Sequence, residues 1–286
     1  MWLGVNPLGH DRTCQPSMER YQVILAYDGS RYKGFQRQAY ARSVQGVVED
    51  ALRKLNWQGK SILAAGRTDT GAHASGQVVA FDLEWVHTSQ DLQQALNNLL
   101  PTDVVAREVK HVCSSFHPRF DASWRKYLYQ IYCQPVRDPI HEPYAWRIWP
   151  AVELLRLKEI AQPLIGTHDF CSFGSPPKTG GNTVRDVLES SWRQDSPFFV
   201  YEIVGNAFLY HMVRRVVFMQ VRIAQGKLDL TDLVEALEPG SGSAESEIRK
   251  ADPAKRSVHG LAPAQGLSLA EVHYPVDAVR WDEDTK

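Results

Sequence analysis

Residues 65–74 read AGRTDTGAHA and place a single carboxylate, Asp69, between two glycines. Glycines permit tight turns and the close approach of another backbone, so this loop can be shaped around a bulky ligand. Arg67 stands two positions before the acid, and a neighbouring guanidinium favours the ionised form of a carboxylate. The spacing therefore suits Asp69 as a nucleophile or a base. The same residues also fit a purely structural turn in which Asp69 caps the backbone after Thr68.

The composition is that of an ordinary globular protein, with 43% hydrophobic and 23% charged residues in a chain of 286. That length allows one large domain or two of ordinary size. No run approaches the roughly 18 apolar residues of a membrane span, and the N-terminus lacks a secretory signal pattern. Free thiols in a reducing cytosol are indicated by four widely spaced cysteines: Cys14, Cys113, Cys133 and Cys171. We therefore expect a cytoplasmic protein with no membrane partner.

Charge is segregated along the chain, although the formal net charge is only −1. Residues 29–42 and residues 210–227 contain basic side chains and no acid, whereas residues 228–247 contain acids and no base. Segregation of this kind can form a basic face for nucleic acid on a nearly neutral protein. Each stretch alone fits an ordinary solvated surface equally well.

Residues 32–38, with the sequence YKGFQRQ, alternate aromatic rings with basic and amide side chains. Rings stack on bases and cations contact phosphates, so this stretch, which includes Arg37 and Gln38, suits RNA binding. Packing of loop residues on a hydrophobic core explains the pattern equally well.

Hydrophobic periodicity predicts a β-α-β-β-α-β order of elements in the first half of the chain. The expected elements are a strand over 21–27, a helix capped by Ser43, strands over 61–64 and 77–83, a helix from Thr88 or Ser89 to Pro101, and a strand over 104–112. This is the split pattern of a ferredoxin-like unit, with Asp69 in the loop between its second and third strands.

The second half approximates the same order with longer connections. The expected elements are a strand over 124–132, a helix over 154–165, strands over 184–192 and 198–204, helices over 210–225 and 230–237, and a strand over 267–274. Residues 170–182 are rich in Gly and Pro and are expected to form a mobile loop. We expect three segments, namely a flexible extension over 1–20, an N-terminal half over 21–115 and a C-terminal half over 116–286.

The loop around Asp69 resembles the signature loop of the TruA-type tRNA pseudouridine synthases. Similarity to that family continues through short motifs that occur in order along the chain. They lie at residues 27–38, 43–52, 116–129, 166–170, 206–214 and 262–267. Each motif is short, but their common order makes the resemblance specific, and it extends over about residues 21–274.

The resemblance implies an α+β fold of two ferredoxin-like halves that share a continuous mixed sheet, with a central catalytic cleft. It implies a homodimer that isomerises uridine to pseudouridine at positions 38, 39 and 40 of the tRNA anticodon arm. That reaction breaks the N1–C1′ bond and rejoins the base through C5, so it is redox-neutral. We therefore expect no cofactor and no metal ion.

The resemblance also implies roles for individual residues. Asp69 is the catalytic carboxylate, Tyr127 stacks on the target base, Arg214 pairs with Asp69, and Arg67 helps to open the stem. The residues expected to bind the RNA substrate are Tyr127, Arg37, Gln38, Arg67, His73 and Arg214.

Several alternatives stay open on the residues alone. Tyr127 also fits a core tyrosine, and Arg214 also fits an ordinary surface position on a helix. His73 and His211 fit structural or RNA-contacting roles better than acid–base catalysis. The competing functions are a non-catalytic tRNA-binding protein and a hydrolase that uses Asp69 on a small nucleoside.

Overall fold

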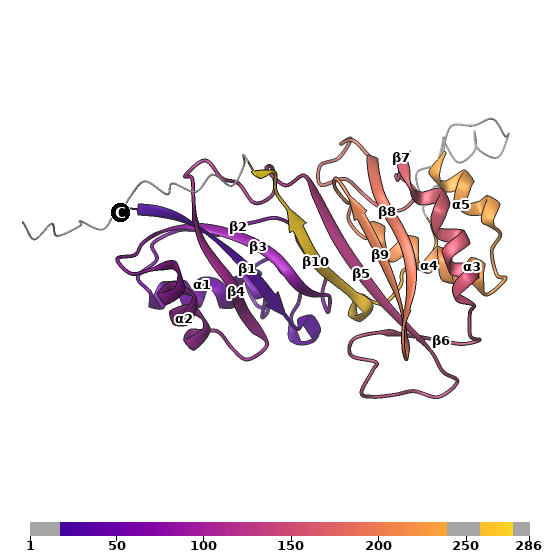
Figure 1. The fold of residues 1–286 in the computed structure, drawn as a ribbon, viewed down its shortest axis with the longest axis horizontal. Helices are drawn as coiled ribbons and strands as arrows, with labels where there is room; N and C mark the ends of the chain where they lie inside the picture. The colour runs from indigo at the N-terminus through magenta and orange to yellow at the C-terminus, as the bar shows by residue number, and fades with distance from the viewer. Residues whose placement is uncertain (1–17, 239–257, 277–286) are drawn as a thin grey trace, which may run out of the picture.

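The structure of the protein is a computed structural model that describes residues 18–238 and 258–276 (Figure 1). Most of the predicted N-terminal extension, Cys14 and the acidic stretch from residue 239 onward lie outside the described residues. The described residues form one large mixed sheet with helices packed against it, which confirms the predicted α+β fold class. No helix in these residues is long and apolar enough to cross a membrane. Cys113 and Cys133 are free thiols.

The first half follows the predicted order. Its elements are β1 (Met18–Tyr27), the 3₁₀ turn η1 (Gly29–Arg31), α1 (Val44–Lys54), β2 (Leu63–Ala64), β3 (His73–Glu84), α2 (Ser89–Leu99) and β4 (Val104–Val112). The strands lie in the order β4-β1-β3, and β2 pairs with β3. Ser43 caps α1 by accepting a hydrogen bond from the Gly46 N–H at 3.2 Å, and Thr88 forms a capping box with Asp91. Helices α1 and α2 lie together beside this part of the sheet (Figure 1). Apolar residues of both helices pack with β1, β3 and β4 in one hydrophobic core.

The second half contains a similar unit with additions. Its elements are β5 (Trp124–Cys133), β6 (Trp146–Ile148), α3 (Leu154–Ala161), η2 (Gln162–Leu164), β7 (Gly166–Asp169), β8 (Val184–Asp195), β9 (Phe198–Gly205), α4 (Met212–Ala224), α5 (Leu230–Leu237), η3 (Ala264–Gly266) and β10 (Leu267–His273). The strand order β10-β5-β9-β8 repeats the order β4-β1-β3-β2 of the first half. Helices α3, α4 and α5 close a second core at the far end of the sheet (Figure 1).

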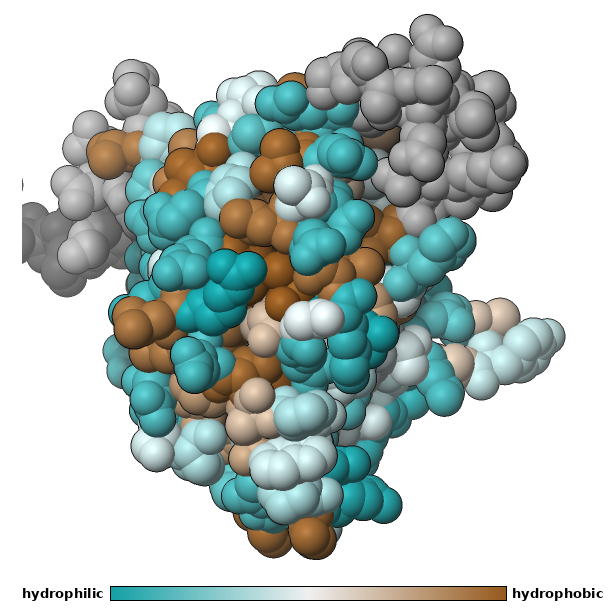
Figure 2. Space-filling view, turned by 90° about the vertical axis from the view of Figure 1, so that its right-hand side faces the viewer, coloured by the Kyte–Doolittle hydropathy of each residue, from teal (hydrophilic) through white to brown (hydrophobic). Residues whose placement is uncertain are grey.

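The end of the molecule formed by α3 and α5 exposes apolar side chains at its centre, with polar ones around them (Figure 2). Leu155 on α3 and Val234 on α5 are among the exposed apolar residues of these helices. This end lies beyond the second core, far along the sheet from the strands of the first half.

The two halves meet where β3 changes its neighbour. Farther along its length, β3 pairs with β2, whose Leu63 lies opposite Ala80. At its start it pairs in parallel with β10, where Ser268 lies opposite His73. The loop that connects β2 to β3, residues 65–72, therefore lies at the junction of the two halves, with β5 as the next strand beyond β10.

Several predicted boundaries differ from the structure. The helix expected from residue 210 begins at Met212, because His211 has a left-handed φ of 68°, which is incompatible with a right-handed helix. The helix expected over 154–165 ends at Ala161 and continues as a 3₁₀ turn that contains Pro163. Strand β3 begins four residues before the predicted Gln77, because its first residues pair with β10.

Candidate active site

Asp69 and Arg214 meet at the junction of the two halves. The Nη1 atom of Arg214 lies 2.5 Å from Oδ2 of Asp69, and the two side chains are only 12% and 15% exposed. Arg214 is the third residue of α4, and its Nε donates to the Ala262 carbonyl at 2.7 Å. The guanidinium thus joins the first half, helix α4 and the segment that leads into β10. It is not a surface arginine.

A backbone hydrogen bond closes the turn that carries Asp69. The Ala72 N–H donates to the Asp69 carbonyl at 3.1 Å, and Gly71 has a φ of +81° that favours glycine. The carboxylate accepts no backbone N–H from the described residues, so it does not cap the turn. Its Oδ1 has no hydrogen-bond partner among those residues and is free to meet a ligand.

Two side chains of the first half form hydrogen bonds with the loop that carries Asp69. The Tyr27 hydroxyl lies 2.7 Å from Oγ1 of Thr68, and Nε2 of buried Gln77 donates to the Gly66 carbonyl at 2.9 Å. Sequence reasoning overlooked both contacts. Tyr27 and Gln77 lie on adjacent strands, β1 and β3, and their position at the sheet end nearest the loop is the signal that could have found them.

His211 is the second group that reaches Asp69, with Nε2 3.6 Å from Oδ2. Its ring stacks on Tyr210 at 3.7 Å between centroids. Burial lowers the pKa of His211 below its ordinary value of 6.5; Asp69 opposes this shift, while Arg214 and Arg215 add to it. The imidazole is therefore neutral at neutral pH.

Tyr127, on β5, lines the same hollow as Asp69. Its ring packs edge-on against Phe208, with centroids 5.0 Å apart and planes at 77°. Burial raises the pKa of Tyr127 to about 12; Arg125 lowers it and Asp69 raises it further. The hydroxyl is thus protonated at neutral pH, and part of the side chain remains open to the hollow.

Arg67 lies at the exposed rim of this hollow. Within the described part of the chain it makes no hydrogen bond and no ion pair. The structure therefore brings together Asp69, Arg214, Tyr127 and Arg67, which come from both halves of the sequence.

The other residues predicted to bind RNA have contacts elsewhere. The Arg37 Nη1 lies 2.5 Å from Oε2 of fully buried Glu49, although 45% of the Arg37 side chain remains exposed. Gln38 donates from Nε2 to the Lys33 carbonyl at 2.6 Å and is exposed. The Nδ1 of His73 accepts from the Gly29 N–H at 3.1 Å, and its Nε2 lies 3.1 Å from the Gln265 carbonyl. These three side chains do not line the Asp69 hollow.

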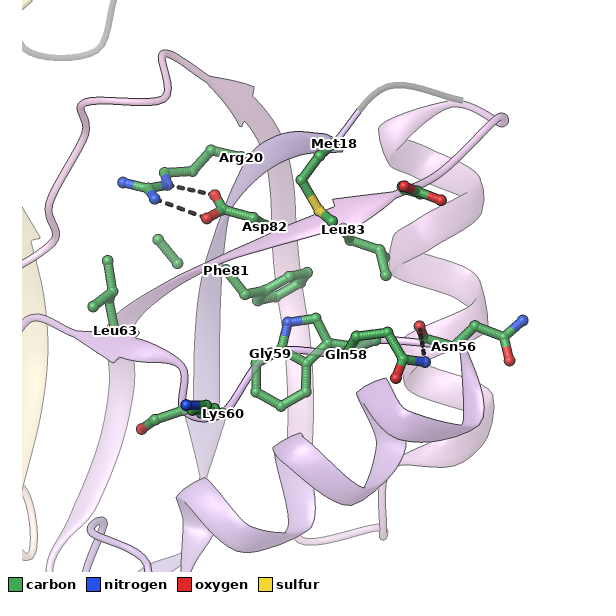
Figure 3. A pocket seen from close by; sticks show the side chains of 14 residues that line it. Met18, Arg20, Asn56, Gln58, Gly59, Lys60, Leu63, Phe81, Asp82 and Leu83 are labelled. Atoms are coloured by element: carbon green, nitrogen blue, oxygen red, sulfur yellow. Dashed lines mark hydrogen bonds and ion pairs between the residues drawn. The ribbon is translucent and has the colours of Figure 1, made fainter. Parts of the chain in front are cut away.

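The hollow at Asp69 is small, about 60 Å³. A larger hollow of about 470 Å³ lies at the far end of β3 (Figure 3). There Asp82 accepts two hydrogen bonds from the Arg20 guanidinium. Sites for small molecules are typically about 300–1,000 Å³. The hollow at Asp69 lies well below this range.

Comparison with known proteins identifies the family of the chain. The profile of the family described as tRNA pseudouridine synthase matches residues 23–121 and 160–275. The tRNA pseudouridine synthase A of Geobacillus kaustophilus is 36% identical over 258 residues, which cover 90% of this chain and 95% of the relative. The protein of the same name from Moorella thermoacetica is 37% identical over 88% of this chain and 98% of its own length. That from Lacticaseibacillus casei is 33% identical over 90% and 100%.

The chain therefore belongs to the tRNA pseudouridine synthase family, a family of isomerases. This confirms the family and the enzyme class that the ordered motifs predicted.

Proposed function

We propose that the protein isomerises uridine to pseudouridine at positions 38, 39 and 40 of the tRNA anticodon arm, with Asp69 as the catalytic carboxylate. The observation that carries this proposal is the 2.5 Å contact between Asp69 and Arg214 at the junction of the two halves. It is supported by the family membership of the chain over nearly its whole length. We also propose that the enzyme acts in the cytoplasm as a homodimer.

The reaction breaks the N1–C1′ bond, turns the uracil, and forms a C5–C1′ bond while the C5 proton is lost and N1 gains one. A carboxylate can start it by attack on the base, by attack on the sugar, or by removal of the C2′ proton. Each route needs a carboxylate with one free oxygen. Arg214 donates a hydrogen bond to Oδ2 of Asp69 and leaves Oδ1 without a partner in the described part of the chain. The ion pair thus orients the carboxylate for any of the three routes.

Tyr127 and Arg67 help the target base to leave its stack and enter the hollow at Asp69. Taking a base out of its stack costs a few kcal/mol, and an aromatic platform returns about 1–3 kcal/mol per base. Tyr127 provides a neutral ring on the wall of the hollow. Arg67, exposed at the rim and without a described partner, is placed to contact the phosphates or the opened stem.

Arg37 and Gln38 remain proposed RNA contacts, because both retain exposed surface. For His73, which is only 8% exposed, we propose a structural role and no contact with RNA. Its two ring nitrogens contact Gly29 and Gln265, so it fixes the backbone behind the catalytic loop.

Mapping of pseudouridine in defined transcripts tests the proposal. Anticodon-arm RNAs with a single uridine at position 38, 39 or 40, and a fourth with one uridine elsewhere in the stem, are incubated with the enzyme. Carbodiimide treatment and primer extension should give stops at the three positions and none in the fourth RNA. Absence of a stop at all three would overturn the assignment of the region. Release of free uracil would instead indicate a hydrolase.

A further inference from the structure

The loop between β4 and β5 carries an aromatic side chain, Phe120, that lies outside the hydrophobic core. Phe120 is 75% exposed, whereas Phe116, four residues earlier, is fully buried and anchors the loop in the first core. The His117 ring lies 4.3 Å from the Phe120 ring, and the Arg119 guanidinium lies 5.9 Å from it. Water surrounds most of this ring, which is unfavourable for an isolated molecule.

Hydrogen bonds within the loop, and one from Tyr274 after β10, nevertheless hold its backbone in place. The His117 N–H donates to Oδ2 of Asp121 at 2.8 Å, and the Asp121 N–H donates back to the His117 carbonyl at 3.1 Å. The Arg119 N–H donates to Nδ1 of His117 at 3.1 Å, and the Tyr274 hydroxyl donates to the Pro118 carbonyl at 2.7 Å. Phe120 is thus fixed in an exposed position and does not depend on a flexible tip.

Arg125 connects this loop to the candidate active site. Its guanidinium donates to the carbonyls of Arg119 and Ala122 on one side, and to that of Asn206 on the other at 2.7 Å. Arg125 and Tyr127 are two residues apart on β5, so their side chains leave the same face of the sheet. Two residues after Asn206, Phe208 packs on Tyr127. The loop therefore borders the face on which Asp69 and Tyr127 lie.

A fixed, exposed ring with a guanidinium beside it matches the chemistry of an unstacked nucleotide. Bases of single-stranded RNA stack on aromatic side chains, and arginine contacts the adjoining phosphate. We propose that Phe120 and Arg119 form a second nucleotide subsite, in which Phe120 stacks on a base neighbouring the target nucleotide. This inference rests on the proposed function and extends it from the target base to the RNA strand around it.

Affinity for RNA tests the subsite directly. The wild type, Phe120→Ala and Phe120→Trp are titrated with an anticodon-arm RNA that carries 2-aminopurine beside the target uridine. Phe120→Ala should weaken binding about 5- to 150-fold and remove quenching of the 2-aminopurine, because base stacking on one aromatic ring is lost. Phe120→Trp should restore both.

Ile140→Ala is the matched control, because Ile140 is likewise 75% exposed but lies in the connection after β5. It should bind the RNA as the wild type does. Wild-type affinity and quenching in Phe120→Ala would overturn the proposal. A change in its sedimentation with unchanged RNA affinity would overturn it as well, and would assign Phe120 to a protein contact. These measurements do not need catalysis, so they remain decisive even if no pseudouridine is formed.

Discussion

Arg214 and Asp69 are 145 residues apart in the chain, yet their side chains form an ion pair of 2.5 Å at the junction of the two halves. The pair links the loop after β2 to the first turn of α4. Because the same guanidinium also holds the Ala262 carbonyl, the arginine fixes both the orientation of the acid and the segment before β10. Both the orientation of the Asp69 carboxylate and the position of the segment before β10 thus depend on the Arg214 side chain.

Arg214→Met should therefore lower both stability and activity. Removing one partner leaves Asp69 as an unpaired, largely buried charge, which should cost about 3 kcal/mol in the free energy of unfolding. Urea denaturation measures this cost, and Arg222→Met on the same helix is the control. Asp69→Asn combined with Arg214→Met should cost less than the sum of the two single changes, because the residues interact directly. Additive costs would show that the pair is not coupled in solution.

His211 should make the stability of the enzyme fall in weak acid. Because its pKa is lowered by burial in the folded state, the unfolded chain binds the proton more readily as the pH falls from about 7 through 6.5. The free energy of unfolding should decline over that range, and the decline should be smaller in His211→Asn. Asparagine tolerates the left-handed backbone at this position, so the variant should fold.

The comparison requires denaturation curves at several pH values for the wild type, His211→Asn and His87→Gln, whose side chain is exposed on the surface. His87→Gln should follow the wild-type curve. An identical pH dependence in His211→Asn and the wild type would show that the imidazole beside Asp69 does not contribute.

Gly29→Ala should displace the loop that carries Asp69. A Cβ atom at Gly29 would lie 1.9 Å from the Ala72 carbonyl oxygen, so backbone has to move. We expect a loss of about 1–3 kcal/mol, typical of overpacking, together with a lower rate of pseudouridine formation. Gly66→Ala is the control for stability, because its Cβ would meet only the Tyr127 hydroxyl at 3.8 Å. Equal thermal stability of the two variants would contradict the packing argument.

Much of the first half could be predicted from the sequence because its signals are local. Periodic apolar residues, the Ser43 cap and the Thr88 capping box define elements joined by short connections. The alternation along residues 124–132 likewise predicted β5. The sequence did not predict β6 and β7, since each has only three or four residues within irregular segments. It also missed the early start of β3, which depends on pairing with a strand almost 200 residues later.

In the candidate site, too, the sequence did not predict the features that depend on long-range contacts. Asp69 and the residues around it, Arg214, Tyr127 and Arg67, could be named from the ordered motifs. They could not be named from spacing alone, because no local pattern brings residues 69 and 214 together. The left-handed conformation of His211, which turns its ring toward Asp69, has no sequence signal in a non-glycine residue. The sequence did not predict the contact of Arg37 with Glu49 either, because nothing distinguishes Glu49 from an ordinary residue of a helix.

The rate of pseudouridine formation by Asp69→Asn in a single turnover tests the central claim most directly. The change keeps the shape of the side chain and removes its charge, and Asp50→Asn, at a 70% exposed side chain, is the control. With saturating anticodon-arm RNA, Asp69→Asn should bind as the wild type does and react at least about 10²- to 10⁴-fold more slowly, the range expected for loss of a catalytic acid or base. A correctly folded Asp69→Asn enzyme that forms pseudouridine at the wild-type rate would contradict the assignment of Asp69 as the catalytic carboxylate.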